Sequence, residues 1–181
     1  PEQTLQWTGG PKGHLSLIDQ TLLPTKLQSV SCHDVQTVWE AIKSLRVRGA
    51  PAIGIAAAYG VCIGIQTLDF ANASKDSLRR RMEEVTSYLA SSRPTAVNLF
   101  WALDRMACKA TSLLETEITI KQVAETLLQE AKNIHDEDRA MCHAIGRHGA
   151  ELLANGMGVI THCNAGGLAT SEYGTALSLF F

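Results

Sequence analysis

The chain has 181 residues, of which 45% are hydrophobic and 19% are charged, and its formal net charge is −2 at pH 7. This balance is typical of a globular protein with a sizeable core, and it excludes a disordered or fibrous chain. Eighteen acidic against sixteen basic residues leave no positive surplus for a nucleic-acid backbone or an anionic membrane surface, so we expect a small-molecule or protein partner.

The first elements predicted along the chain are two strands. Residues 5–7 and 14–18 are short segments of alternating apolar and polar character, and they flank a glycine-rich turn at residues 9–13. This pattern is typical of an antiparallel β-hairpin. A short extended piece around residues 27–30 is expected after the breaker Pro24.

A helix and a long apolar stretch are predicted next. Ser31 with Asp34 fits a capping box, and we expect the helix that it opens to end within residues 46–49. Residues 50–68 are the most apolar part of the chain, but they lack aromatic or basic anchors and are barely long enough to cross a membrane. We therefore expect residues 52–68 to form a buried helix at the centre of the fold.

Further helical patterns follow. Apolar residues recur at helical spacing over residues 78–89, and a new helix can start at Pro94. Thr119 with Gln122 fits another capping box, which opens a long helical pattern that extends, with or without a break, to Leu153. In all, four to six helices are expected before the pattern changes.

The pattern changes at Gly156 from helical to strand-like. Residues 159–161 are apolar and β-branched, glycines follow at once, and a helical pattern resumes at Leu168. A strand, a glycine turn and a helix in this order form the first half of a βαβ unit. A lone unit of this kind has no neighbouring strand, so we expect a truncated chain or one part of a larger assembly.

Cys163 is the most informative candidate for chemistry, because it falls between the predicted strand and the predicted helix. Open α/β sheets bind ligands at this end of a strand, and a helix N-terminus favours a thiolate or a bound anion. The alternative is a small buried cysteine, and the residues alone leave both open. A dyad of Cys163 with His162 is not expected, since successive strand residues point to opposite faces.

Two arginines precede predicted helices. Arg48 stands before Gly49 and Ala50, and Arg93 stands before Pro94. At such a junction a guanidinium and free backbone N–H groups could converge on one phosphate. The alternative is that each arginine only bonds to carbonyl groups of the helix that ends there.

The other titratable residues point to no additional site. His143 and His148 are five residues apart, which does not suit a helical metal site, and we expect neither a metal ion nor a cofactor. The arginines at residues 79–81 are followed by glutamates, as on a solvated helix face. The five cysteines are an odd set without a CxxC pair, from which we expect a reducing cytoplasm.

Three motifs, in order, resemble the methylthioribose-1-phosphate isomerase family. They are residues 47–54 (VRGAPAIG), residues 92–99 (SRPTAVNL), and residues 162–166 (HCNAG) followed by residues 173–177 (YGTAL). The similarity runs nearly end to end. The wider superfamily also contains ribose-1,5-bisphosphate isomerases and the regulatory subunits of translation initiation factor two-B.

The resemblance implies an α+β N-terminal domain of a small antiparallel sheet and helices over residues 1–154, and the start of a Rossmann-like domain over residues 155–181. It implies a homodimeric cytoplasmic enzyme of methionine salvage with a phosphorylated sugar as its partner. The reaction would be the aldose–ketose isomerisation of 5-methylthioribose 1-phosphate to 5-methylthioribulose 1-phosphate. No nucleic acid and no membrane are expected as partners.

The resemblance also implies roles for individual residues. Arg48, Gly49, Ala50 and Arg93 match substrate-binding positions, and Cys163 matches a cysteine that acts on the transition state or in proton transfer. The family's catalytic aspartate matches no carboxylate in this chain, so we expect little or no turnover without a complementary C-terminal fragment. The alternatives are a ribose-1,5-bisphosphate isomerase and a non-catalytic sugar-phosphate or nucleotide sensor of the initiation-factor type.

Overall fold

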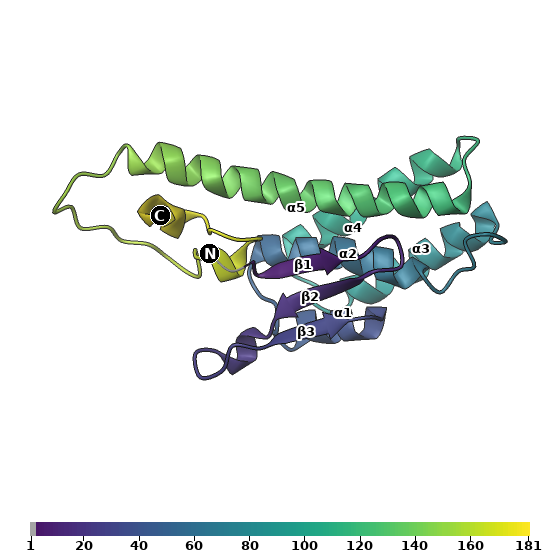
Figure 1. The fold of residues 1–181 in the computed structure, drawn as a ribbon, viewed down its shortest axis with the longest axis horizontal. Coiled ribbons are helices and arrows are strands. Elements are labelled where there is room, and N and C mark those ends of the chain that lie inside the picture. Colours follow the sequence, from purple (N-terminus) through teal and green to yellow (C-terminus); the bar gives the residue numbers. More distant parts are fainter. Residues whose placement is uncertain (1–2) are drawn as a thin grey trace.

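The computed structural model describes residues 3–181, which form a small antiparallel sheet packed beside a group of helices (Figure 1). Strands β1 (Leu5–Thr8), β2 (His14–Ile18) and β3 (Ser29–Cys32) lie in the order β1–β2–β3. Leu5 pairs with Leu17 across the first two strands, and both are buried, because alternate residues face the helices. The predicted hairpin is confirmed, and the extended piece that follows it joins the sheet as β3.

Helix α1 (Val35–Lys43) begins at a different cap from the one predicted. Asp34 is the N-cap, and its carboxylate accepts the backbone N–H of Thr37 at 2.7 Å, whereas Ser31 lies within β3. The prediction of a capping box from Ser31 was therefore wrong, since the hydroxyl belongs to a strand. The helix also ends before the predicted range, because Leu45 adopts a φ of 66° and turns the chain.

Helix α2 (Ala50–Ile65) is the centre of the molecule, as predicted. Every one of its residues from Ala52 onward is buried, and α1, α3, α4, α5 and the sheet all contact it. Small residues allow this close packing: a methyl group added at Gly64 would lie 2.5 Å from the side chain of Val85 on α3. Across residues 3–181, no helix combines the length and the apolar character needed to cross a membrane.

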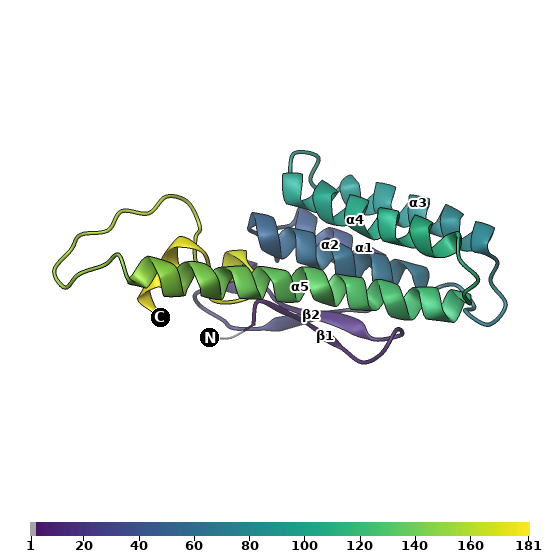
Figure 2. The same cartoon turned by 90° about the horizontal axis from the view of Figure 1, so that it is seen from above.

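Three more α-helices complete the five of the described chain: α3 (Lys75–Ala90), α4 (Val97–Leu114) and α5 (Ile120–Ala150). They match the predicted patterns, except that α4 begins at Val97 and Pro94 lies in the turn before it. The Thr119 capping box of α5 is confirmed, and the helix runs unbroken for 31 residues along the length of the molecule (Figure 2).

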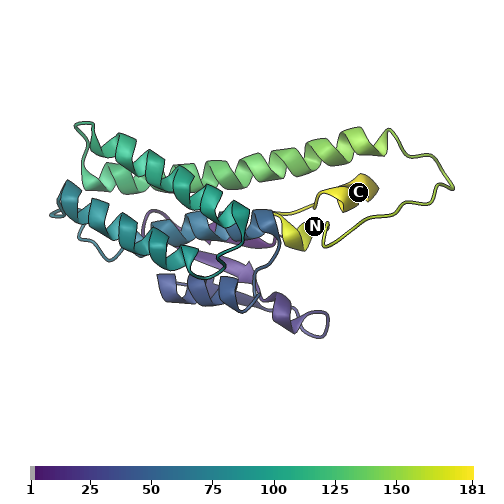
Figure 3. The same ribbon diagram turned by 180° about the vertical axis from the view of Figure 1, so that it is seen from behind.

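The C-terminal segment differs from the prediction. Residues 159–161 form an exposed loop, with Ile160 99% exposed, and the chain returns through two short 3-10 helices, η2 (Gly167–Ala169) and η3 (Ala176–Phe180) (Figure 3). No strand within residues 3–181 lies beside this loop, so its backbone groups have no sheet partner. The α+β N-terminal part is thus confirmed, whereas the predicted strand and helix of a βαβ unit are not formed here.

Candidate functional site

The segment that follows Cys163 returns to the N-terminal part of the fold. Gln20 donates a side-chain hydrogen bond to the carbonyl of Leu168 at 2.8 Å, and the hydroxyl of Thr4 donates to the carbonyl of Gly167 at 2.7 Å. These bonds attach the glycine-containing turn to residues that precede β1 and β3. The chain between the two parts of the third motif is therefore held against Thr4 and Gln20.

Gly49, in the first motif, lies against the chain that connects the two parts of the third motif. Its φ of 98° lies in the region that favours glycine, and a methyl group added there would lie 2.6 Å from the Cβ of Ala169. Gly49 is also the N-cap residue of α2, and no side chain caps that helix. The positive end of the α2 dipole consequently lies beside the chain that follows Cys163.

The two candidate arginines precede α2 and α4. Arg48 is exposed and Arg93 is half-buried. Among residues 3–181, the ion pairs include neither arginine, so their guanidinium groups are not neutralised by a neighbouring carboxylate. Ala50, the first residue of α2, is exposed beside Arg48. The starts of both helices can therefore receive an anion.

Cys163 lies in a setting other than the one predicted. It is exposed, its φ is 66°, and no strand precedes it because residues 159–161 are irregular. The nearest helical turn is the three-residue η2, which starts at Gly167. His162 is likewise exposed. In this structure the thiol is accessible, but neither the end of a strand nor the first turn of an α-helix holds it.

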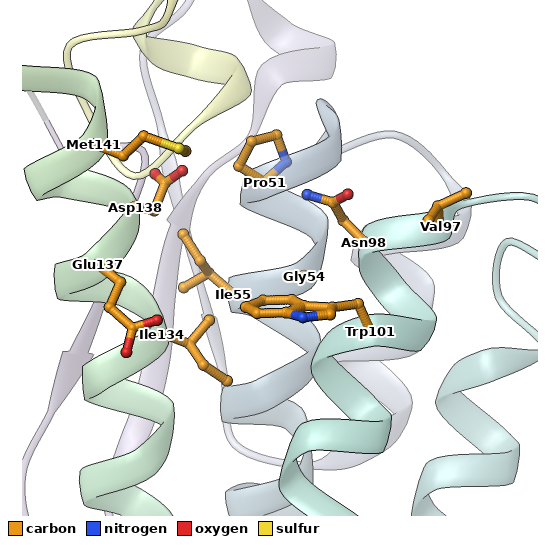
Figure 4. Close-up of a pocket in the computed structure, with 10 residues that line it drawn as sticks. All are labelled: Pro51, Gly54, Ile55, Val97, Asn98, Trp101, Ile134, Glu137, Asp138 and Met141. Atoms are coloured by element: carbon orange, nitrogen blue, oxygen red, sulfur yellow. The ribbon is translucent and has the colours of Figure 1, made fainter. Parts of the chain in front are cut away.

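A cavity of about 430 Å³ lies between α2, α4 and α5 (Figure 4). It begins at the first turns of α2 and α4, the helix ends that Arg48 and Arg93 precede. Its walls combine apolar side chains with one amide and two carboxylates: Pro51, Gly54, Ile55, Val97, Asn98, Trp101, Ile134, Glu137, Asp138 and Met141.

The two carboxylates of the cavity are held differently. Glu137 is paired with Arg105, whose Nη1 and Nη2 donate to the two carboxylate oxygens at 2.5 and 2.8 Å. The hydrogen bond from Arg105 lowers the pKa of Glu137, against the opposing effect of burial. Asp138 is only 7% exposed, and its Oδ2 accepts the backbone N–H of Ser171 at 2.7 Å. Its carboxylate thus ties α5 to the C-terminal segment.

Sequence reasoning missed most of this cavity. Asn98 lies within a motif quoted above, but Trp101, Asp138 and Met141 were not singled out. The available signal was the spacing of Ile134, Asp138 and Met141, which places a carboxylate between two apolar residues on one face of α5. The spacing along α5 does not reveal which other helices pack against that face.

The chain is similar to proteins of known name. Residues 46–178 match the Initiation factor 2 subunit family. The 5-deoxyribose 1-phosphate isomerase of Bacillus cereus is 51% identical over 162 residues, which are 90% of this chain and 46% of the relative. The methylthioribose-1-phosphate isomerase of Herpetosiphon aurantiacus is 48% identical over 178 residues, 97% of this chain and 47% of the relative. The chain thus spans about half the length of these curated relatives.

Two solved structures share the fold. The 5-methylthioribose 1-phosphate isomerase of Pyrococcus horikoshii OT3 superposes with a TM-score of 0.88 at 36% identity, covering 99% of this chain and 48% of that one. Subunit delta of the translation initiation factor eIF-2B from A. fulgidus superposes with a TM-score of 0.84 at 40% identity, covering 99% and 50%. A protein named as an isomerase and a protein named as a translation factor subunit therefore have the same architecture over this region.

Proposed function

The chain belongs to the Initiation factor 2 subunit family. We propose that it is the N-terminal part of an aldose–ketose isomerase. The proposed reaction converts 5-methylthioribose 1-phosphate to 5-methylthioribulose 1-phosphate. The observation that carries the proposal is that relatives about half identical over at least 90% of the chain are named as isomerases of 5-deoxyribose or methylthioribose 1-phosphate. The chain is accordingly related to sugar-phosphate isomerases.

In the proposed mechanism the phosphate of the substrate binds at the start of α2. Two unpaired guanidinium groups, on Arg48 and Arg93, and the uncapped helix start at Gly49 and Ala50 support this role. The phosphate blocks the anomeric carbon of the sugar, so the ring opens before or during the transfer of hydrogen between C1 and C2. Cys163 would stabilise the transition state or take part in this transfer.

The proposed enzyme needs more chain than these 181 residues. The curated relatives are about twice as long, and we assign residues 1–154 to an N-terminal domain and residues 155–181 to the start of a Rossmann-like domain that further residues would complete. The acid–base partner of Cys163 would come from that remaining half. The chain by itself would then show little or no turnover, because transition-state stabilisation requires the complete set of groups.

A second candidate function is a non-catalytic sugar-phosphate or nucleotide sensor. The observation that favours it is the similarity to eIF-2B subunit delta, with a TM-score of 0.84 over 99% of the chain. A sensor of this kind would bind its ligand through Arg48 and Arg93 and would be indifferent to Cys163. The retained HCNAG motif favours the isomerase, since a sensor has no need of a reactive thiol.

The two functions are separated by measuring binding and turnover in the same variants. Residues 1–181 are joined to the remaining half of the Bacillus cereus relative, and the conversion of 5-methylthioribose 1-phosphate is followed. Cys163→Ala should reduce turnover about a hundredfold or more while sugar-phosphate binding is kept. Cys108→Ala is the matched control, because Cys108 is also an exposed free thiol, and it should leave turnover unchanged.

Two outcomes would contradict the isomerase proposal. Near-parent turnover in Cys163→Ala would remove the role given to the thiol. A joined protein that binds the sugar phosphate through Arg48 and Arg93 but never isomerises it would favour the sensor.

A further inference from the structure

The C-terminal segment is attached to α5 by a carboxylate with two partners. The segment returns beside the second half of α5 (Figure 1 and Figure 2). Nε of Arg139 and Nε2 of His143 lie 3.2 and 3.3 Å from the same oxygen of Glu172, Oε1. Arg139 and His143 are four residues apart on one face of α5, so both side chains reach one carboxylate. The Glu172 side chain is only 14% exposed, so water screens these contacts less than those of a surface ion pair.

The residue after Glu172 makes a second contact with the same part of α5. The ring of Tyr173 stacks on the imidazole of His143, with the ring centroids 4.1 Å apart and 30° between the planes. Tyr173 has a φ of 71°, which a residue other than glycine adopts rarely. Such a conformation persists only where the surrounding contacts hold it. We call the four residues Arg139, His143, Glu172 and Tyr173 the latch.

Backbone contacts connect the latch to the loop that carries Cys163. The N–H groups of Thr175 and Leu177 both donate to the carbonyl of Ala165, at 2.9 and 3.3 Å. A methyl group added at Gly174 would lie 2.6 Å from the same carbonyl oxygen, so the two stretches of chain are in close contact. Ala165 is only two residues after Cys163, and its fixed carbonyl therefore limits where the loop can place the thiol.

The loop that carries Cys163 has a strained backbone. Cys163 has a φ of 66°, and among residues 3–181 only Leu45 and Tyr173 share a positive φ without being glycine. Leu45 ends α1, whereas the other two residues lie on either side of the contact with Ala165. Strained residues concentrate at functional sites, where contacts from the rest of the structure hold them. For Cys163 these contacts lead through Ala165 to the latch.

Resting on the function proposed above, we propose that Arg139 and His143 are positioning residues of the isomerase. They hold Glu172 on α5, and through Glu172 they fix the loop that carries Cys163. A thiol that acts in the transition state must be held in one geometry, and a small displacement lowers the rate. The phosphate is proposed to bind at the starts of α2 and α4, away from the latch. Loss of the latch should therefore lower kcat much more than it raises KM.

The first test uses the 181-residue chain and hydrogen exchange followed by NMR. Glu172→Leu keeps a side chain of similar size but removes the oxygen that both partners contact, and it should increase exchange at the amide of Thr175 about tenfold. Glu172→Gln keeps an oxygen for the two partners, and its exchange should stay within about threefold of the parent. The amide of Val123, at the other end of α5, should be unchanged in both variants, which excludes a general loss of structure.

The second test uses the joined protein and the conversion of 5-methylthioribose 1-phosphate. Glu172→Leu should lower kcat about tenfold or more, while KM changes by less than about threefold. Glu172→Gln should restore most of the lost kcat. Asp136→Asn is the matched control, because Asp136 is the other carboxylate beside Arg139, at 3.4 Å and with 64% of its side chain exposed. This variant should leave kcat and KM unchanged.

Double variants test whether the two α5 residues act through Glu172. Arg139→Met removes one partner of the carboxylate, and His143→Phe removes the other but keeps a ring to stack on Tyr173. Each should lower kcat about threefold by itself. Neither should lower it further when it is combined with Glu172→Leu, because the contact is then already absent.

The outcomes that overturn the latch differ from those that overturn the isomerase. Unchanged exchange at Thr175 in Glu172→Leu, equal losses of kcat in the Leu and Gln variants, a change in KM alone, or additive losses in the double variants would each reject the positioning role. If the parent joined protein shows no turnover, the isomerase function fails, and the exchange at Thr175 by itself decides whether the latch fixes the loop. Turnover that is unaffected by Glu172→Leu rejects the latch alone.

Discussion

His135 is a buried histidine that forms a hydrogen bond through only one of its two ring nitrogens. It lies on α5 with 5% exposure, and its Nδ1 is 3.0 Å from the hydroxyl of Tyr59 on α2. Its Nε2 is buried and has no hydrogen-bond partner within residues 3–181. Burial lowers the pKa of His135 below the usual value, and the nearby charge of Arg139 acts in the same direction. Three carboxylates oppose this shift in pKa: Asp136, Asp138 and Glu172.

The lowered pKa of His135 predicts a loss of stability in mild acid. The unfolded chain binds a proton at about pH 6.5, whereas the folded histidine binds it only at a lower pH. The stabilisation is thus complete above about pH 6.5 and declines as the pH falls toward the folded pKa, by up to about 1.4 kcal/mol per pH unit.

The measurement is the free energy of unfolding in urea at pH 7.5 and pH 5.5. His135→Gln should reduce the difference between the two values, whereas His148→Gln, at an exposed histidine of the same helix, should not. An equal pH dependence in His135→Gln and the parent would show that another group causes the loss.

At the scale of an element, the start of α5 depends on two reciprocal hydrogen bonds. The hydroxyl of Thr119 accepts the backbone N–H of Gln122 at 3.3 Å, and Oε1 of Gln122 accepts the backbone N–H of Thr119 at 2.9 Å. These bonds satisfy two backbone N–H groups at the helix start. The helix that begins here supplies Ile134, Asp138 and Met141 to the cavity.

Thr119→Ala should lower the free energy of unfolding by about 1 kcal/mol, because it removes the capping hydroxyl. Thr126→Ala is the control on the same helix: its hydroxyl donates to the carbonyl of Gln122 within the helix, and alanine is the better helix former there. Urea unfolding of both variants provides the comparison. Equal losses in the two variants would contradict a specific contribution from the cap.

At the scale of the whole molecule, the C-terminal segment is bound to parts of the fold that are distant in sequence. The N–H of Thr4 donates to the carbonyl of Ser171 at 3.0 Å, and the N–H of Ser171 donates to Asp138 at 2.7 Å. Gly49 packs against Ala169 so closely that a side chain at residue 49 would collide with it. The packing of this segment therefore depends on the absence of a Cβ at Gly49.

Gly49→Ala should release the segment and increase hydrogen exchange at the amides of Thr4 and Ser171 about tenfold or more, since local opening exposes them. Gly156→Ala is the matched control, because Gly156 also has a positive φ, of 87°, but has no atom within 4 Å of an added methyl group. It imposes the same backbone strain without the collision. If both variants exchange equally fast, strain and not the contact with Ala169 is responsible.

The sequence by itself determined the features that neighbours along the chain control. The hairpin, the cap at Thr119 and a buried central helix all follow from local features: turn residues, a hydrogen bond between residues three apart in the sequence, and apolar content. The helix was predicted over residues 52–68 and extends over Ala50–Ile65. The motifs around Arg48 and Cys163 likewise indicate the family from the sequence alone.

Only the tertiary structure decided which of these segments meet. Gly49 contacts Ala169, and Asp138 faces Pro51 across a cavity, because three helices pack at particular rotations that no single periodicity specifies. Residues 159–161 have strand-forming side chains but form a loop, since a strand needs the hydrogen bonds of a neighbour and the described chain offers none. Local sequence thus sets the elements, and long-range packing sets the site.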